Sequence, residues 1–200
     1  MTNHNIILKN YDGFLFVISG PSGVGKDTVV SEIKKLKYPY YYPITITTRK
    51  PRNEETHGIH YYFVHQTEFQ KLILQNQLLE WANVYGDLYG VPKELVYKAL
   101  EKGEKVLLKL DVQGALKIKS DFPKSTLIFI TAPDSELKSR LMKRMTETNE
   151  KISQRLETAK KEKEMIRKFD YTIDNKDGDL KYTVSKINQI IDLVTNSKLT

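Results

Sequence analysis

An apolar run near the start of the chain ends directly in a glycine-rich turn, and this junction constrains the fold more than any other feature. The run is FLFVIS at Phe14–Ser19. A continuous run of β-branched and aromatic residues is typical of a strand covered on both faces, as in parallel sheets flanked by helices. The turn GPSGVGK follows at once, and a helical pattern begins after it. The sequence therefore predicts a strand, a glycine loop and a helix in an α/β fold.

Strands and helices alternate along much of the remaining chain. Further strands are predicted at Val106–Leu110, Thr126–Thr131 and Tyr171–Ile173. Helices are predicted at Asp27–Lys37, Pro92–Lys102, Asp134–Met145, Asn149–Lys168 and Asp179–Asn196. Such alternation favours a parallel sheet with helices packed against it.

The stretch from residue 38 to residue 91 has a different character. It is rich in tyrosine and contains the short alternating runs ITITT and HYYFV, which are typical of strands with one exposed face. One helix is predicted at Thr67–Asn76, opening with the T-x-x-Q pattern of a capping box. We interpret this stretch as an inserted, mainly β lobe.

Composition narrows the class of protein. The chain has no cysteine, so neither disulfides nor a thiolate metal site can stabilise it. It has neither a secretory signal pattern nor an apolar segment of about 18 residues, so we expect a cytoplasmic protein with no membrane partner. A net charge of +7 suits a polyanion, although solvated lysines give the same balance. Because the basic residues are spread widely, without RNA-binding or zinc signatures, we expect no nucleic-acid partner.

The glycine loop has the spacing of a phosphate-binding loop. It comprises Gly20, Pro21, Ser22, Gly23, Val24, Gly25, Lys26, Asp27 and Thr28. The glycines let the backbone turn tightly and direct its N–H groups inward, and the following helix N-terminus adds positive potential toward a triphosphate. Lys26 would reach the β- and γ-phosphates. The alternative, a βα turn with an incidental lysine, is disfavoured by the flanking strand and helix.

The residue after the lysine departs from the usual motif. A Ser or Thr hydroxyl normally binds Mg²⁺ there, but this chain has Asp27, followed by Thr28. Mg²⁺ accepts carboxylate oxygens and keeps several waters. Two possibilities therefore stay open: Thr28 holds the Mg²⁺ ion, or Asp27 holds it directly or through water.

A second set of residues suits a phosphate monoester and a purine. The segment TITTRKPRNEE places Arg49 and Arg52 three residues apart in an extended stretch, and guanidinium forks match phosphate geometry. Tyr61 and Tyr89 can donate phenolic hydrogens to the same phosphate. Glu80, in LLEW, can accept from N1–H and N2–H₂ of guanine. Each residue also has a plainer interpretation as surface charge or packing.

Together these motifs resemble the guanylate kinase family. The phosphate loop is followed by TTRKPR, GIHYYF, LLEWA, YG and DVQG in the family's order, and the resemblance runs from about Phe14 to the last helix. It implies a P-loop NTPase-type parallel sheet flanked by helices, an inserted mainly β acceptor-binding lobe and a helical lid. It also implies an ATP:GMP phosphotransferase of purine nucleotide metabolism that needs Mg²⁺, with ATP and GMP as partners, dGMP as a further acceptor, and either a monomeric or a homo-oligomeric state.

The resemblance assigns roles residue by residue. The positions that hold GMP in the family are matched by Thr45, Arg49, Arg52, Glu55, Tyr61, Glu80, Tyr89 and Asp111. Asn175 matches a residue near the ATP base. The lid arginines that close over the transferring phosphate are matched by Arg140, Arg144 and Arg155. The predicted catalytic residues are therefore Lys26, Arg49, Arg140, Arg144 and Arg155.

The resemblance also divides residues 1–200 into parts of one folding unit. The predicted core comprises about 12–37, 92–133 and 169–200, the GMP-binding lobe about 38–91, and the lid about 134–168. The chain is long enough for one good core, and no linker or repeat separates these parts. We therefore expect lobes of a single unit instead of tethered domains.

Three further positions depart from the family pattern. Val91 stands where a Ser or Thr hydroxyl usually helps to bind guanine, and a buried O6 without a donor would cost about 1–3 kcal/mol. We expect Thr45 or a backbone N–H to supply that donor, while Glu80 repels N1 of adenine. His60 and Lys109 stand where aspartates are common. Because Lys109 replaces a carboxylate that helps to organise Mg²⁺ in the family, Asp27 becomes a stronger candidate for the metal ligand.

These departures keep two alternatives open. One is a P-loop kinase of another nucleoside monophosphate. The other is a noncatalytic guanylate-kinase-like module that binds proteins, against which the retained Lys26, Arg49 and Arg52 argue.

Overall fold

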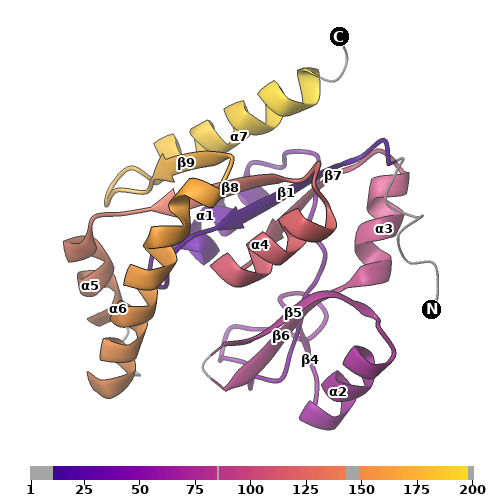
Figure 1. The fold of residues 1–200 in the computed structure, drawn as a ribbon, viewed down its shortest axis with the longest axis horizontal. Coiled ribbons are helices and arrows are strands. Elements are labelled where there is room, and N and C mark those ends of the chain that lie inside the picture. Colours follow the sequence, from indigo (N-terminus) through magenta and orange to yellow (C-terminus); the bar gives the residue numbers. More distant parts are fainter. Residues whose placement is uncertain (1–10, 85, 143–148, 198–200) are drawn as a thin grey trace. The chain divides into compact units, whose positions relative to one another are not determined.

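The computed structural model describes residues 11–84, 86–142 and 149–197, and it confirms the predicted α/β class (Figure 1). A parallel sheet has the strand order β2-β7-β1-β8-β9, and a second sheet has the order β4-β3-β6-β5. The strands are β1 (Phe14–Ser19), β2 (Tyr40–Tyr41), β3 (Ile46–Thr47), β4 (Tyr62–Phe63), β5 (Leu78–Val84), β6 (Asp87–Pro92), β7 (Lys105–Lys109), β8 (Thr126–Thr131) and β9 (Tyr171–Asp174).

The helices follow the predicted pattern, with shifts of one or two residues at several ends and the larger differences given below. They are α1 (Lys26–Lys35), α2 (Gln66–Leu74), α3 (Lys93–Glu101), α4 (Val112–Asp121), α5 (Asp134–Met142), α6 (Asn149–Glu164) and α7 (Leu180–Asn196), with a 3-10 turn, η2 (Met165–Lys168), after α6. Helix α4 was not predicted, the α-helical part of the segment predicted to reach Lys168 ends at Glu164, and Met145 lies outside the described residues. Within the described ranges, no helix combines the length and apolarity that crossing a membrane requires.

The predicted capping box at the start of α2 is wrong. The helix begins one residue earlier than predicted, with His65 as its N-cap and no side-chain cap hydrogen bond. The His65 carbonyl accepts from the N–H of Phe69 at 3.0 Å. Thr67 therefore lies within the first turn, where its hydroxyl is no longer at the capping position.

Residues of the chain group into two compact units. One unit contains the chain up to Leu15, Pro39–Leu108 and Ser120–Phe122. The other contains Phe16–Tyr38, Lys109–Lys119 and the chain from Pro123. Below, they are called the first unit and the second unit.

In the first unit, α2 packs on the four-stranded sheet (Figure 1). Its Phe69 is fully buried in a cluster with Ile46, Leu78 and Leu88 from three strands. A glycine on β6 makes this close packing possible, because a Cβ at Gly90 would lie 2.9 Å from side-chain atoms of both Leu78 and Phe69. Since β5 and β6 also form an antiparallel pair, the sheet and helix share one small core.

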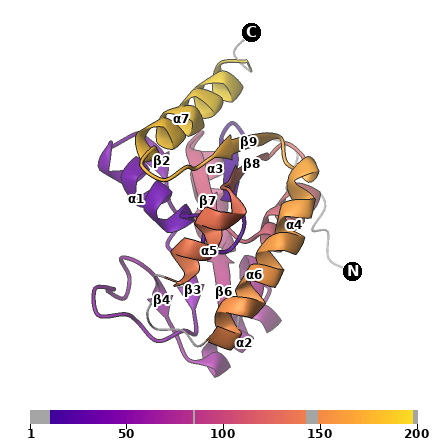
Figure 2. The same cartoon turned by 90° about the vertical axis from the view of Figure 1, so that its left-hand side faces the viewer.

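In the second unit, β1 pairs in parallel with β8, and β8 pairs in parallel with β9. Strands β1 and β8 are almost wholly buried. Helix α7 buries Val184, Ile187 and Ile191, which recur every three or four residues and so lie on one helical face. This helix contacts α1 and β9, and α5 contacts α6 (Figure 2). At the end of β1, a Cβ at Gly20 would lie 2.1 Å from the Ile130 carbonyl oxygen, so only glycine lets the chain leave the sheet there.

Phe69→Ala should destabilise the first unit by about 3–5 kcal/mol, because it removes a buried ring and leaves a cavity. Urea unfolding followed by fluorescence measures this loss. The single tryptophan, Trp81, reports on the same unit because it lies on β5. The control is Leu74→Ala on the same helix, where the side chain is 84% exposed and the change should stay within about 0.5 kcal/mol. Equal losses in both variants would contradict the core assigned here.

Candidate active site

The loop between β1 and α1 has the backbone of an anion-binding turn. Gly23 and Gly25 have φ angles of 83° and 94°, a region that favours glycine. Gly25 is the N-cap of α1 and makes no side-chain cap hydrogen bond. The first amide groups of α1 and the helix dipole are therefore directed toward the loop, which confirms the predicted strand, glycine loop and helix.

Lys26 folds back over this loop. Its ammonium donates to the carbonyl of Gly20 at 2.5 Å and to that of Pro21 at 3.2 Å. Burial lowers the pKa of Lys26, while the nearby carboxylates of Glu162 and Asp27 act in the opposite direction. The structure thus places a desolvated cation at the strand end of the glycine loop.

The two candidate magnesium ligands lie at the start of α1. The Asp27 carboxylate forms an ion pair with Lys109 at the end of β7, and its side chain is 64% exposed. Thr28 is exposed beside it. Among the described residues, no group of three or more His, Cys, Asp and Glu side chains is arranged to hold a metal. A metal ion here would therefore need phosphate and water oxygens to complete its shell.

A carboxylate from α6 also reaches the loop. The Oε2 atom of Glu162 accepts a hydrogen bond from the Ser22 backbone N–H at 3.0 Å. Burial raises the pKa of Glu162, the Lys26 ammonium opposes this, and the Asp111 carboxylate adds to it. Sequence reasoning missed Glu162, because it stands in the charged run KKEKE, where nothing distinguishes it from its neighbours.

Arg140 and Asn175 hold the other side of the loop. The guanidinium of Arg140 donates to the carbonyls of Val24 at 3.0 Å and Asn175 at 2.7 Å, and to the carboxylates of Glu136 at 2.8 Å and Asp177 at 2.9 Å. The Asn175 amide donates to the same Val24 carbonyl at 2.7 Å. Both predicted residues are therefore at the phosphate loop, where their donors engage protein oxygens.

Arg155, Arg144 and Asp111 are the other predicted residues that belong to the sequence of the second unit. Arg155 lies half-buried on α6, and Arg144 lies outside the described residues. Asp111 accepts from the Gly114 N–H at 2.7 Å and so caps α4. Its charge also acts on Lys26. Asp111, predicted to lie near the acceptor nucleoside, is thus placed by the structure close to Lys26.

The first unit gathers three predicted residues, Glu55, Tyr61 and Tyr89, around a fourth, Arg49. Pairing of β3 with β6 sets Thr47 opposite Tyr89, and Arg49 follows two residues later. Its guanidinium donates to Glu55 at 2.8 Å and to the Tyr89 hydroxyl at 3.2 Å, and it lies 5.6 Å from the centre of the Tyr61 ring. Burial would lower the pKa of Arg49, but the hydrogen bonds to Glu55 and Tyr89 outweigh it and raise the pKa. We call these four residues the Arg49 cluster.

Three more residues of this unit were predicted to bind the phosphoryl acceptor: Thr45, Arg52 and Glu80. The Arg52 side chain is exposed, and its backbone N–H donates to Glu55 at 2.8 Å. Thr45 is half-buried, and its carbonyl accepts from the N–H of Tyr62. Glu80 is buried on β5, with 4% of its surface exposed, and it pairs in register with Val91 on β6. Directly paired residues share a face of the sheet. Val91, which departs from the family pattern, therefore lies beside Glu80, the residue predicted to bind guanine.

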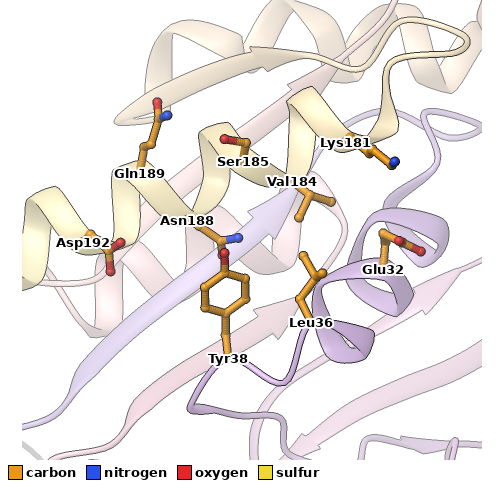
Figure 3. A pocket seen from close by; sticks show the side chains of 9 residues that line it. All are labelled: Glu32, Leu36, Tyr38, Lys181, Val184, Ser185, Asn188, Gln189 and Asp192. Carbon is orange, nitrogen blue, oxygen red and sulfur yellow. The ribbon is translucent and has the colours of Figure 1, made fainter.

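A hollow of about 370 Å³ lies between α1 and α7 in the second unit. Figure 3 shows Tyr38 pointing toward Asn188 of α7, with Leu36 lying near Val184. None of the predicted site residues lines this hollow, so it is no candidate for a substrate site.

Comparison with known proteins supports the motif assignment. A sequence model of the guanylate kinase family matches residues 13–193. Guanylate kinase from Halalkalibacterium halodurans is 41% identical to this chain over 185 residues, which cover 92% of this chain and 90% of that protein. The protein of the same name from Desulfitobacterium hafniense is 42% identical, and the match covers 92% of each.

The fold has a close match among solved structures. The crystal structure of guanylate kinase from Anaplasma phagocytophilum superimposes with a TM-score of 0.75 at 30% sequence identity. The match covers 94% of this chain and 88% of that one. The similarity therefore covers the residues of both units.

The Glu55 carboxylate should support folding of the first unit in a pH-dependent way. The hydrogen bond from Arg49 lowers the pKa of Glu55, with burial acting against it. A carboxyl group whose pKa is lower in the folded state stabilises the fold above its unfolded pKa, and this gain is lost as pH falls through the folded pKa. Glu55→Gln should therefore reduce the free energy of unfolding by about 1–2 kcal/mol at pH 7.

Urea unfolding at several pH values tests this dependence. The difference between variant and wild type should shrink once the pH drops below about 4, the ordinary pKa of glutamate. The control, Glu54→Gln, changes an exposed neighbour and should leave stability almost unchanged. A Glu55→Gln loss that is constant across the pH range would contradict the assigned pair.

Proposed function

Because the chain belongs to the guanylate kinase family, we propose that it transfers the γ-phosphoryl group of ATP to GMP, giving ADP and GDP. The observation that carries the proposal is the Arg49 cluster. Phosphate loops bind triphosphates in many enzymes, whereas a guanidinium set between two tyrosines and a carboxylate suits a phosphate monoester. We extend the proposal to dGMP as a second acceptor and to a cytoplasmic role in purine nucleotide metabolism, without nucleic-acid or membrane partners.

We propose that the second unit binds ATP. The backbone N–H groups of the glycine loop would surround the phosphates, and Lys26 would contact the β- and γ-phosphates. Arg140 would act as a positioning residue, since its donors hold the carbonyls of Val24 and Asn175. Asn175 would stand near the base of ATP, as its family position suggests.

On the acceptor side, we propose that Arg49, Arg52, Tyr61 and Tyr89 bind the phosphate of GMP. The Glu55 carboxylate holds both arginine positions, through the side chain of Arg49 and the backbone of Arg52. Glu80 would accept from N1–H and N2–H₂ of guanine, with Thr45 and Asp111 contributing further contacts.

The chemistry requires positioning and charge neutralisation more than acid or base catalysis. The acceptor oxygen must line up with the γ-phosphorus, and the transferring group spreads its charge over three oxygens. The phosphate of GMP is largely ionised near neutral pH, so no general base is needed. Lys26, Arg144 and Arg155 would stabilise the charge in transfer, together with Arg49 on the acceptor.

Mg²⁺ fits the oxygen donors at the start of α1. Asp27 and Thr28 offer a carboxylate and a hydroxyl, which are hard ligands suited to this ion. When bound with ATP, the metal would neutralise charge on the β- and γ-phosphates. The Asp27 carboxylate is already paired with the Lys109 ammonium, so Lys109 and the metal would both supply positive charge to this carboxylate.

A kinase for another nucleoside monophosphate is the second candidate, and Val91 beside Glu80 is the observation that favours it. A valine supplies no hydrogen bond to O6 of guanine. The buried Glu80 still favours guanine, because adenine presents a lone pair at N1 to that carboxylate.

An acceptor panel separates the two candidates. With ATP as donor, GMP and dGMP should give rapid ADP production, and AMP and dTMP should give little. Glu80→Gln should reduce kcat/KM for GMP about 30–160-fold, because a mispaired buried hydrogen-bonding group costs about 2–3 kcal/mol. Coupled ADP detection measures both. The control is Glu68→Gln, an exposed carboxylate on α2, and equal rates with AMP and GMP would overturn the guanine assignment.

Lys26→Met should lower kcat for GMP phosphorylation about 10²–10³-fold, as expected when a preorganised charge at the transferring group is removed. Lys35→Met is the matched control at the other end of α1, where Lys35 pairs with Glu32 on the surface. The control should retain wild-type kcat. Full activity of Lys26→Met would contradict the role of the phosphate loop in transfer.

A further inference from the structure

Glu162 places a negative charge in a loop that is built to receive one. Its carboxylate accepts the Ser22 N–H at 3.0 Å, and so an acidic side chain of α6 reaches the glycine loop. By contrast, Glu157 on the same helix is 70% exposed and pairs with Lys161 at 3.1 Å. The contact between Glu162 and Ser22 joins residues 140 positions apart, so it belongs to the tertiary fold.

The contact lies at the end of the loop where Lys26 holds its ammonium. Lys26 donates to the carbonyls of Gly20 and Pro21, the two residues directly before Ser22. The lysine of such a loop reaches the β- and γ-phosphates, whereas the backbone cradles the α- and β-phosphates. Glu162 therefore approaches the region that the terminal phosphate of a bound triphosphate needs.

Electrostatic repulsion disfavours the Glu162 carboxylate and a terminal phosphate lying beside Lys26 at the same time. Burial raises the pKa of the Glu162 carboxyl, Lys26 counteracts this, and Asp111 adds to it. The Lys26 ammonium is thus shared among carboxylates in a partly desolvated place, where like charges repel strongly. A terminal phosphate would be favoured by the same ammonium and repelled by the same carboxylate.

We propose that Glu162 is a positioning residue that competes with the terminal phosphate of ATP for the Lys26 ammonium, so that ATP binding must displace it from the loop. ADP lacks this phosphate and therefore competes less with Glu162 for Lys26. The inference rests on the proposed function, because it concerns the same ATP site.

Displacement of Glu162 would be transmitted along α6. The next residue, Lys163, ties the helix to the end of β8 through the Ala132 carbonyl at 2.7 Å and through an ion pair with Asp134. Arg155 precedes Glu162 by seven residues, about two helical turns, and so lies on the same side of α6. Exchange of the carboxylate for phosphate therefore releases the helix face that carries a predicted phosphate-binding arginine.

Binding measurements with the full chain test this competition. Glu162→Gln keeps an oxygen that can accept from Ser22 and removes only the charge. We expect the variant to bind a nonhydrolysable ATP analogue with an imido β,γ-bridge about tenfold more tightly than wild type, and ADP within about twofold, in calorimetry with Mg²⁺. The control, Glu157→Gln, should change neither affinity.

Steady-state kinetics adds a second measurement. The KM for ATP should fall in Glu162→Gln while kcat does not rise, and ATP hydrolysis without GMP should increase. Should Glu162→Gln fail to fold, Glu162→Asp takes its place. It keeps the charge but shortens the side chain by one methylene, which weakens the contact and should likewise favour the ATP analogue over ADP.

The other outcomes overturn the inference. Weaker binding of both nucleotides would mean that Glu162 only orders the loop, and unchanged or equally tightened binding of both would exclude competition with the terminal phosphate. If wild type bound neither nucleotide, the ATP site of the proposed function would fail too. If wild type bound both and the variant showed no preference, only the role of Glu162 would fail.

Discussion

The chain must leave a buried strand and enter a helix within a few residues while its amide groups face an anion, and the second unit depends on this turn. Gly20 permits the exit from β1, because any side chain there would collide with a carbonyl of β8. Hydrogen bonds then fix the carbonyl side of the loop: Lys26 binds the carbonyl of Gly20, and Arg140 and Asn175 bind that of Val24. With these carbonyls bound by protein donors, the loop presents its amides to an anion.

Cations at both predicted substrate sites have carboxylates as neighbours. Arg49 pairs with Glu55, Lys109 pairs with Asp27, and Lys26 interacts with Glu162. Partly buried cations need such counter-charges, since desolvation without them is costly. A phosphate that binds to these groups therefore exchanges with, or adds to, an existing anion. Under the proposed function, the affinity for each substrate would be a difference between two favourable interactions, and the protein carboxylates would set part of that difference.

Base recognition rests on a different principle. Glu80 is buried on β5 and pairs in register with Val91, so its carboxylate faces a largely apolar neighbour. A buried carboxylate gains most from a ligand that offers two donors, as the N1 edge of guanine does. Under the proposed function, the preference for guanine would thus come from the carboxylate of Glu80, since the apolar Val91 adds no donor of its own.

The amino-acid sequence by itself determined the parts of this protein that depend on neighbours along the chain. The apolar run of β1 and the glycine spacing of its loop predicted the α/β class and the phosphate loop, because strand burial and tight turns are local properties. The order of motifs likewise singled out Arg49 and Glu80 as candidate site residues. Helix α4 escaped prediction although Asp111 caps it, because Gly114 weakens the helical signal in its first turn.

Only the tertiary structure decided which charges meet. Asp27 and Lys109 are 82 positions apart, and Ser22 and Glu162 are 140 apart. The sequence does not distinguish a charged helix residue that makes a tertiary contact from one that is solvated, and most such residues are solvated. Packing of α6 in the second unit brings one of its carboxylates to the loop while others stay exposed. Which carboxylate meets the phosphate loop follows from long-range packing, which no local pattern of residues encodes.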